Sequence, residues 1–150
     1  MIKSKNIAVF ASGTGSNFTS IHKDIKSGKI NGRIVLLITN NDHYKAIDFA
    51  NANGIKVSII NKDIISDIAK YEDFLLRELE SVVTDLIVLA GYLKMIPSNI
   101  ISKYKNKVLN IHPSLLPKFG GKGFYGMKVH NAVIASRENF TGATVHFVDE

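Results

Sequence analysis

Asn110 and His112 lie two residues apart in the run Asn-Ile-His-Pro-Ser-Leu-Leu-Pro, which covers residues 110–117. The apolar pair Val108-Leu109 before it indicates a buried strand. Side chains on a strand alternate between faces, so the carboxamide and the imidazole should project to the same side. Pro113 lacks a backbone N–H and restricts the residue before it to extended geometry, so strand pairing is expected to stop there. The pair is therefore predicted at the carboxyl end of a strand, where open α/β sheets bind ligands. The alternative, with equal weight on spacing alone, is two polar strand-end residues without a chemical role.

A glycine-rich turn supplies a second set of polar groups. It reads Ser12-Gly13-Thr14-Gly15-Ser16-Asn17 and lies between a predicted strand and a predicted helix. Amides and the dipole at a helix N-terminus favour an anion, and Ser16 and Asn17 add side-chain donors. Phe18 stands where the dinucleotide fingerprint has its third glycine, and the P-loop pattern is absent, so a phosphate on a small metabolite is favoured over NAD. The alternative is an ordinary turn in which Ser16 or Asn17 caps the helix.

A third candidate surface follows the apolar strand expected at 85–90. Gly91 permits a close backbone approach, and the next residues combine free amides with apolar side chains. Such a surface suits a flat heteroaromatic ring that needs both an apolar slot and backbone hydrogen bonds. Taken alone, a segment of this kind is more often part of the core.

The elements that must position these groups alternate between strand and helix patterns. Strands are expected at 7–10, 34–39, 56–60, 85–90, in the segment that ends at His112, and at 143–148. Helices are expected at 17–26, 43–53, 67–83 and 128–136. This alternation predicts an α/β fold with a doubly wound, mostly parallel sheet and right-handed crossovers. Because the pattern stops directly after a strand, residues 1–150 are interpreted as a single domain that is truncated at the C-terminus.

Composition narrows the class of protein. The 150 residues are 45% hydrophobic and include no cysteine, which excludes disulfides and thiolate metal sites and fits a cytoplasmic protein. No apolar run approaches the roughly 20 residues of a membrane helix, and the first residues contain no signal-peptide core. The net charge of +6 comes from scattered lysines, so attraction of small anions is favoured over nucleic-acid binding. The other histidines are His22, His43, His130 and His146, and none of them has the spacing of a metal ligand relative to another. No metal is therefore expected.

These motifs together resemble the phosphoribosylglycinamide formyltransferases, folate-dependent enzymes of purine synthesis. The resemblance runs from residue 6 to 150 and rests on four segments: 12–17, Leu-Ala-Gly-Tyr at 89–92, 110–117, and Thr-Gly-Ala-Thr-Val-His-Phe-Val at 141–148. The His-Pro run is shared with other formyltetrahydrofolate enzymes. The glycine turn with Ser16 and Asn17 is what favours this family.

The resemblance implies a Rossmann-like formyltransferase fold and a formyl transfer in de novo purine biosynthesis. The donor would be 10-formyltetrahydrofolate as co-substrate, and the acceptor would be the amine of 5-phosphoribosylglycinamide. Asn110 and His112 would be catalytic. The phosphate would be held by Gly15, Ser16 and Asn17. The folate would be bound by Leu93, Lys94, Met95, Ile96, Asn110, Asp149 and Glu150. The partners would be these small molecules, without nucleic acid or membrane, and a homodimer is left open.

Two departures from the family pattern qualify this expectation. An arginine that some members place near the folate tail is Ile68 in this sequence. The family's essential aspartate lies several residues after Val148, in a loop that these 150 residues do not reach, so this form is expected to be catalytically incomplete. The alternatives are a formyltetrahydrofolate deformylase and a non-catalytic module that binds a phosphometabolite or folate. A methionyl-tRNA formyltransferase would need a second, basic domain.

Overall fold

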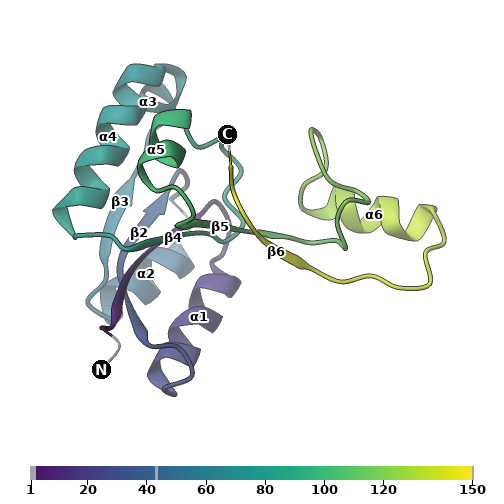
Figure 1. The fold of residues 1–150 in the computed structure, drawn as a ribbon, viewed down its shortest axis with the longest axis horizontal. Coiled ribbons are helices and arrows are strands. Elements are labelled where there is room, and N and C mark those ends of the chain that lie inside the picture. Colours follow the sequence, from purple (N-terminus) through teal and green to yellow (C-terminus); the bar gives the residue numbers. More distant parts are fainter. Residues whose placement is uncertain (1–2, 43, 150) are drawn as a thin grey trace.

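The computed structural model describes residues 3–42 and 44–149 of the chain, so His43 and Glu150 lie outside the described residues. Its elements in order are β1 (Lys5–Ala11), α1 (Ser16–Lys26), β2 (Gly32–Thr39), α2 (Tyr44–Ala52), β3 (Lys56–Ile59), α3 (Lys62–Ser66), α4 (Ile68–Ser81), β4 (Leu86–Leu89), α5 (Ser98–Lys103), β5 (Val108–His112), α6 (Met127–Ala135) and β6 (Thr144–Phe147). Every strand and helix expected from the sequence is present, with ends that differ by a few residues (Figure 1).

The strands form one six-stranded sheet in the order β3-β2-β1-β4-β5-β6. The pairs from β3 to β5 are parallel, and β6 runs antiparallel to β5. The chain winds outward from β1 in one direction through β2 and β3, then returns to the other side of β1 through β4 and β5. This arrangement confirms the doubly wound, mostly parallel sheet, and it makes the carboxyl ends of β1 and β4 the switch point where such sheets bind ligands.

Apolar clusters cover both faces of the sheet. One cluster contains Phe10, Ile38 and Ile87 from the strands and packs against α4, which buries Tyr71 and Leu75. The opposite cluster contains strand residues such as Val9 and Leu37 and packs against α1 and α2. Strands that are buried on both faces explain the continuous apolar runs in the sequence.

Two short helices, α3 and α5, were not expected from the sequence. The Asn61 side chain caps α3 by accepting a hydrogen bond from the amide of Ile64 at 2.9 Å. Pro97 precedes α5, in which Ile100 is fully buried. Both helices are shorter than two turns, so hydrophobic periodicity has too few repeats to reveal them.

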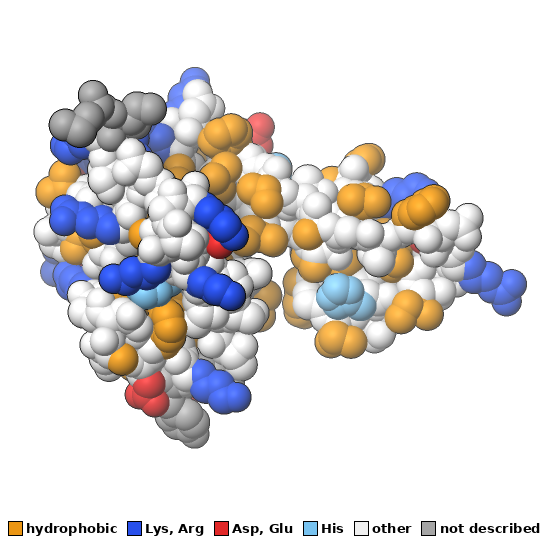
Figure 2. Space-filling model, turned by 90° about the horizontal axis from the view of Figure 1, so that it is seen from below, with side chains coloured by type: hydrophobic (Ala, Val, Ile, Leu, Met, Phe, Trp, Pro, Cys, Tyr) orange, Lys and Arg blue, Asp and Glu red, His pale blue; other side chains and the backbone are white. Residues whose placement is uncertain are grey.

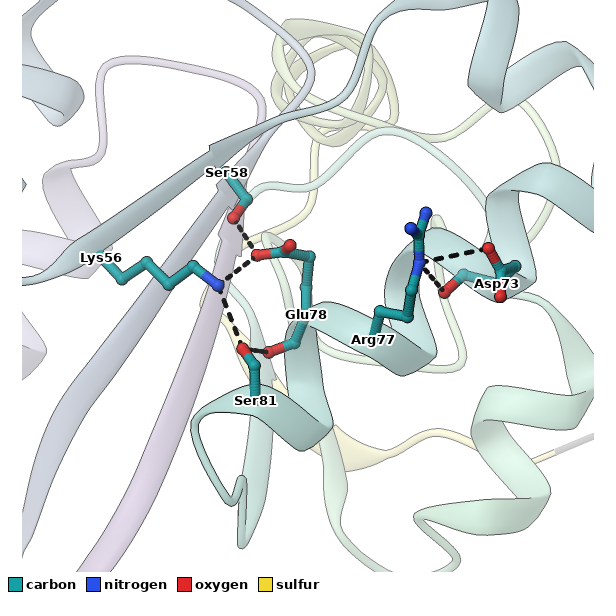
Figure 3. A network of polar contacts seen from close by, with 6 residues as sticks. All are labelled: Lys56, Ser58, Asp73, Arg77, Glu78 and Ser81. Carbon is teal, nitrogen blue, oxygen red and sulfur yellow. Dashed lines mark hydrogen bonds and ion pairs between the residues drawn. The ribbon is translucent and has the colours of Figure 1, made fainter.

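A polar network ties the edge strand β3 to α4 (Figure 3). Lys56 Nζ lies 2.8 Å from Glu78 Oε2 and 3.0 Å from Ser81 Oγ, and Ser58 Oγ donates to the same Glu78 carboxylate. Burial acts to raise the pKa of Glu78, but the hydrogen bonds from Lys56 and Ser58 and the positive charge of Lys56 outweigh it, so the pKa is lowered. The network therefore fixes the outer strand with an ionised carboxylate.

The segment between β5 and β6 extends away from the main body and carries α6 at its end (Figure 1). Figure 2 shows hydrophobic side chains gathered on this extension. In the segment between β5 and β6, Phe140 is 82% exposed and Ile134 is 75% exposed. No helix in the described ranges is long and apolar enough to cross a membrane.

Candidate functional site

Asn110 sits in a row of residues that runs across the sheet. Strand register places Phe10 beside Leu89, Leu89 beside Asn110, and Asn110 beside His146. Neighbours in a row project to the same face. Phe10 and Leu89 are buried in the core, whereas Asn110 and His146 are half-buried. The row therefore changes from apolar to polar where it reaches β5, near the carboxyl edge of the sheet.

The Asn110 and His146 side chains contact each other, with Nδ2 of Asn110 3.2 Å from Nε2 of His146. His146 Nδ1 lies 3.0 Å from the carbonyl oxygen of Phe147. A carbonyl only accepts, so Nδ1 carries the hydrogen, and the neutral ring then accepts from the amide at Nε2. This contact orients the Asn110 carboxamide and leaves its second N–H available to another acceptor.

His112 is the last residue of β5, and its ring contacts the loop that follows this strand. Nε2 of His112 lies 2.8 Å from the carbonyl oxygen of Phe119, so Nε2 carries a hydrogen in this conformation. Thr144, paired with His112 in the sheet, holds the same loop. Its Oγ1 donates to the Ser114 carbonyl at 2.7 Å and accepts from the Leu116 amide at 3.0 Å. The imidazole is thus held between a strand and an anchored loop.

The glycine turn ends at Gly15, which is the N-cap of α1 and has a φ of 81°. A Cβ at Gly15 would lie 2.9 Å from the Cβ of Ala46, so the turn also packs closely on α2. Within the described chain, no side chain makes a capping hydrogen bond at the N-terminus of this helix, and its first turn holds no acidic residue. Ser16 and Asn17 are exposed. The ordinary-cap alternative is therefore not what the structure contains, and the helix start presents amides and side-chain donors to solvent.

The loop after β4 presents apolar side chains at the same edge. Leu93 is 58% exposed and Met95 is 89% exposed, and Lys94 is exposed as well. Ile96 is buried in the core, as is Tyr92. In the segment predicted to bind a heteroaromatic ring, residues 93–95 are therefore exposed to solvent, and Ile96 holds the segment to the core.

Tyr92 anchors the other end of this loop. Its hydroxyl lies 2.7 Å from that of Tyr71 on α4, and its ring meets Phe10 edge-on at a centroid distance of 5.2 Å. Burial raises the pKa of Tyr92, and the hydrogen bond that it shares with Tyr71 adds to the shift. Tyr92 is therefore a neutral core residue that fixes where the loop leaves β4.

The sheet order brings the three predicted segments to one edge. The glycine turn follows β1, the apolar loop follows β4 and the Asn110–His112 pair ends β5, and these strands are neighbours. Asp149 lies two residues after β6 and is exposed. Glu150 lies outside the described residues. Ile68 is the first residue of α4 and is 62% exposed.

Three contacts of this site were not foreseen from the sequence: His146 with Asn110, the Phe119 carbonyl with His112, and Thr144 with the loop. Each joins residues whose proximity depends on the pairing of β6 or on a loop path. His146 and Thr144 do alternate with apolar residues in the pattern of a half-buried strand, which was the available signal.

A doubly wound sheet with polar residues from β5 and a glycine turn at its carboxyl edge is a fold of small-molecule enzymes. The chain belongs to the formyl transferase family, whose model matches residues 5–150.

Curated relatives point to one branch of this family. The chain is 44% identical over 160 residues to "Phosphoribosylglycinamide formyltransferase, chloroplastic" of Vigna unguiculata. The alignment covers 99% of this chain and 48% of that protein. The chain is also 44% identical over 153 residues to the protein of that name from Arabidopsis thaliana, covering 97% of this chain and 50% of the relative. The chain thus spans about half the length of these curated relatives.

Solved structures agree with this assignment. Glycinamide ribonucleotide transformylase 1 from Geobacillus kaustophilus superposes with a TM-score of 0.88 at 37% identity, covering 98% of this chain and 76% of that chain. A formyltetrahydrofolate deformylase from Pseudomonas syringae superposes with a TM-score of 0.85 at 22% identity, covering 99% of this chain and 47% of that chain, which shows the fold alone.

Proposed function

We propose that the protein carrying this chain transfers a formyl group from 10-formyltetrahydrofolate to the amine of 5-phosphoribosylglycinamide in de novo purine biosynthesis. The observation that carries the proposal is the pair Asn110 and His112 at the end of β5. Strand β4, which leads into the apolar loop, lies between β5 and β1, which leads into the glycine turn. The names of the plant relatives favour this reaction over others of the family.

In this proposal the substrate phosphate binds at the start of α1. The amides after Gly15 and the side chains of Ser16 and Asn17 donate to it, and the helix dipole adds to the attraction. The positive φ of Gly15 lets the chain turn sharply into α1 at this point. The net charge of +6 favours the approach of anionic substrates.

The folate would lie against the loop from Leu93 to Ile96. Exposed apolar side chains at Leu93 and Met95 offer a surface for a flat ring, and backbone groups of the loop offer hydrogen bonds. In this proposal, Lys94 and Asp149 lie at the edge of the folate-binding region as its polar residues. The donor carries a formyl group on N10, and the acceptor amine attacks the carbon of that formyl group.

The proposed chemistry forms one C–N bond and breaks another. The amine attacks the formyl carbon, the bond to N10 breaks, and a proton lost by the amine replaces it on N10. Negative charge develops on the formyl oxygen during the attack. The free N–H of Asn110 and a protonated His112 stabilise that charge, and one well-aimed donor is worth roughly 3 kcal/mol. His112 also takes part in the proton transfer, with Nδ1 as the exchanging nitrogen while Nε2 is bonded to Phe119. No metal enters these steps.

The remaining expectations belong to the same proposal. The partners are small molecules, a homodimer is left open, and nucleic acid and membranes play no part. A cytoplasmic location is proposed from the sequence, although two plant relatives are named chloroplastic.

The test separates the two binding regions. In the full-length protein, Ser16→Ala and Asn17→Ala should weaken binding of phosphoribosylglycinamide about tenfold by isothermal titration, because each removes a donor to a charged group. Folate binding should be nearly unchanged. Weakened folate binding instead would mean that the regions are assigned the wrong way round. Release of formate without any formylated product would point to a deformylase.

A further inference from the structure

Ser12 is a buried polar residue to which the proposed reaction gives no role. It follows β1 directly and is only 3% exposed. A serine hydroxyl can both donate and accept, and burial is costly unless it does so. Ser12 does both, and its contacts reach two other strand ends.

On one side, Ser12 meets the residues that follow β2. Its Oγ donates to Oδ1 of Asn40 at 2.5 Å, and its carbonyl accepts from the Asn41 side chain. The Thr39 hydroxyl, at the end of β2, donates to the Asn41 carbonyl at 3.1 Å. Hydrogen bonds at the end of β2 therefore hold the Asn40–Asn41 segment in place, and Asn40 in turn orients the Ser12 hydroxyl.

On the other side, Ser12 holds the loop after β4. Its amide donates to the Gly91 carbonyl at 3.1 Å, and its Oγ accepts from the Leu93 amide at 2.9 Å. Because the Oγ hydrogen is committed to Asn40, the lone pair that faces Leu93 is fixed in direction. Within the described residues, the Ser12 hydroxyl is the only side-chain group that bonds the Leu93 backbone.

The loop needs such an anchor, because its own side chains do not supply one at this point. Leu93 and Met95 are mainly exposed, and Gly91 has a φ of 76° with no Cβ to pack. The buried residues Tyr92 and Ile96 hold the loop on either side. Between them, the Leu93 amide is held by its hydrogen bond to Ser12 Oγ.

We propose that Ser12 is a positioning residue for the folate side of the site: its hydroxyl fixes the Leu93 backbone, and so sets the apolar loop at a defined place beside the anion-binding turn. Ser12 touches neither substrate. It acts through Leu93, with Asn40 as its support. The proposal rests on the proposed function for the identity of the ligand that the loop binds.

The experiment uses the full-length protein with Ser12→Ala, which removes the hydroxyl and keeps the backbone bonds to Gly91 and Asn41. KM for the formyl folate should rise about tenfold, while KM for phosphoribosylglycinamide should change less than about threefold. Amide hydrogen exchange at Leu93 should become at least about tenfold faster, with exchange in the core strands unchanged.

Ser58→Ala is the matched control, because it also removes a buried serine hydroxyl, but one that bonds Glu78 on α4. It should lower stability without changing the KM for the folate. If Ser12→Ala does not fold, Ser12→Cys keeps a one-atom polar group on Cβ with a weaker acceptor and should show the same changes at smaller size.

An unchanged folate KM and unchanged exchange at Leu93 in folded Ser12→Ala would overturn the proposal, as would an equal rise in both KM values. Failure of the proposed function gives a different result: the wild-type protein would then lack formyl transfer. Hydrogen exchange at Leu93 and titration with a folate would still decide the role of Ser12 in that case.

Discussion

The hydroxyl oxygens of Tyr71 and Tyr92 lie 2.7 Å apart in the core, where they join α4 to the start of the loop after β4. Both side chains are almost fully buried. Each hydroxyl is therefore the partner that makes burial of the other tolerable, and the two should act as a unit in stability.

Changing either tyrosine to Phe should lower the free energy of unfolding by about 1–2 kcal/mol, because one buried hydroxyl is left unpaired. The double variant Tyr71→Phe/Tyr92→Phe should cost less than the sum of the single changes, since it leaves neither hydroxyl behind. Urea unfolding measures all three. Tyr125→Phe, at a side chain that is 49% exposed, is the control and should be close to neutral. Additive single effects would contradict a shared bond.

Gly15 and Gly13 offer a matched pair for testing the glycine turn. Gly15→Ala should destabilise the protein by about 1–3 kcal/mol and weaken binding of the phosphorylated substrate, because φ is 81° and the new Cβ would meet Ala46 at 2.9 Å. Gly13→Ala should change stability little, since a Cβ there meets no described atom within 4 Å. Thermal unfolding and titration check both. Equal effects of the two changes would show that the conformation of Gly15 is not what the turn requires.

Glu78 makes the link between β3 and α4 dependent on pH. Its pKa is lowered from the ordinary 4.5, so the stabilisation it provides is complete above that value and is lost as pH falls through the lowered value in the folded protein. Glu78→Gln should cost about 1 kcal/mol at pH 7, and the difference from wild type should shrink below about pH 4.5. Denaturant titrations across this range measure it.

Asp73→Asn is the control for Glu78, because Asp73 pairs with Arg77 on the same helix but both side chains are mainly exposed (Figure 3). Exposed pairs contribute little, so this change should have a small effect at every pH. A gap between wild type and Glu78→Gln that stays constant from pH 7 to about pH 3 would contradict the role of the ionised carboxylate.

The long elements of the fold were predictable because each has its own local signal. The helix α4 shows Tyr71, Leu75 and Leu79 at helical spacing, and β4 is a continuous apolar run. The gathering of the three site segments at one edge also followed from strand–helix alternation, because parallel strands end at the same edge.

What escaped prediction depends on pairing between distant segments. The contact of Asn110 with His146 needs the antiparallel register of β6, and the bonds of Ser12 need the ends of β2 and β4 beside that of β1. A serine before a glycine turn carries no local mark of such a role. The short helices α3 and α5 have too few residues for a periodic signal.

Asn110 and His112 should act together if both stabilise the same developing charge. Each single change to Ala in the full-length protein should lower kcat by roughly 100-fold or more, and the double variant should be little worse than the worse single variant. Folate affinity should change far less than the rate, because the interaction strengthens only as charge develops. Additive losses would mean that the two side chains serve separate steps.

A catalytic role of His112 is best tested by kcat for formyl transfer to phosphoribosylglycinamide in the full-length His112→Ala variant. We expect a kcat lower by roughly 100-fold or more, with a native thermal unfolding profile and the KM of both substrates within about threefold of wild type. A kcat near that of the wild type would contradict it, and would return His112 to a structural residue that holds the loop through the Phe119 carbonyl.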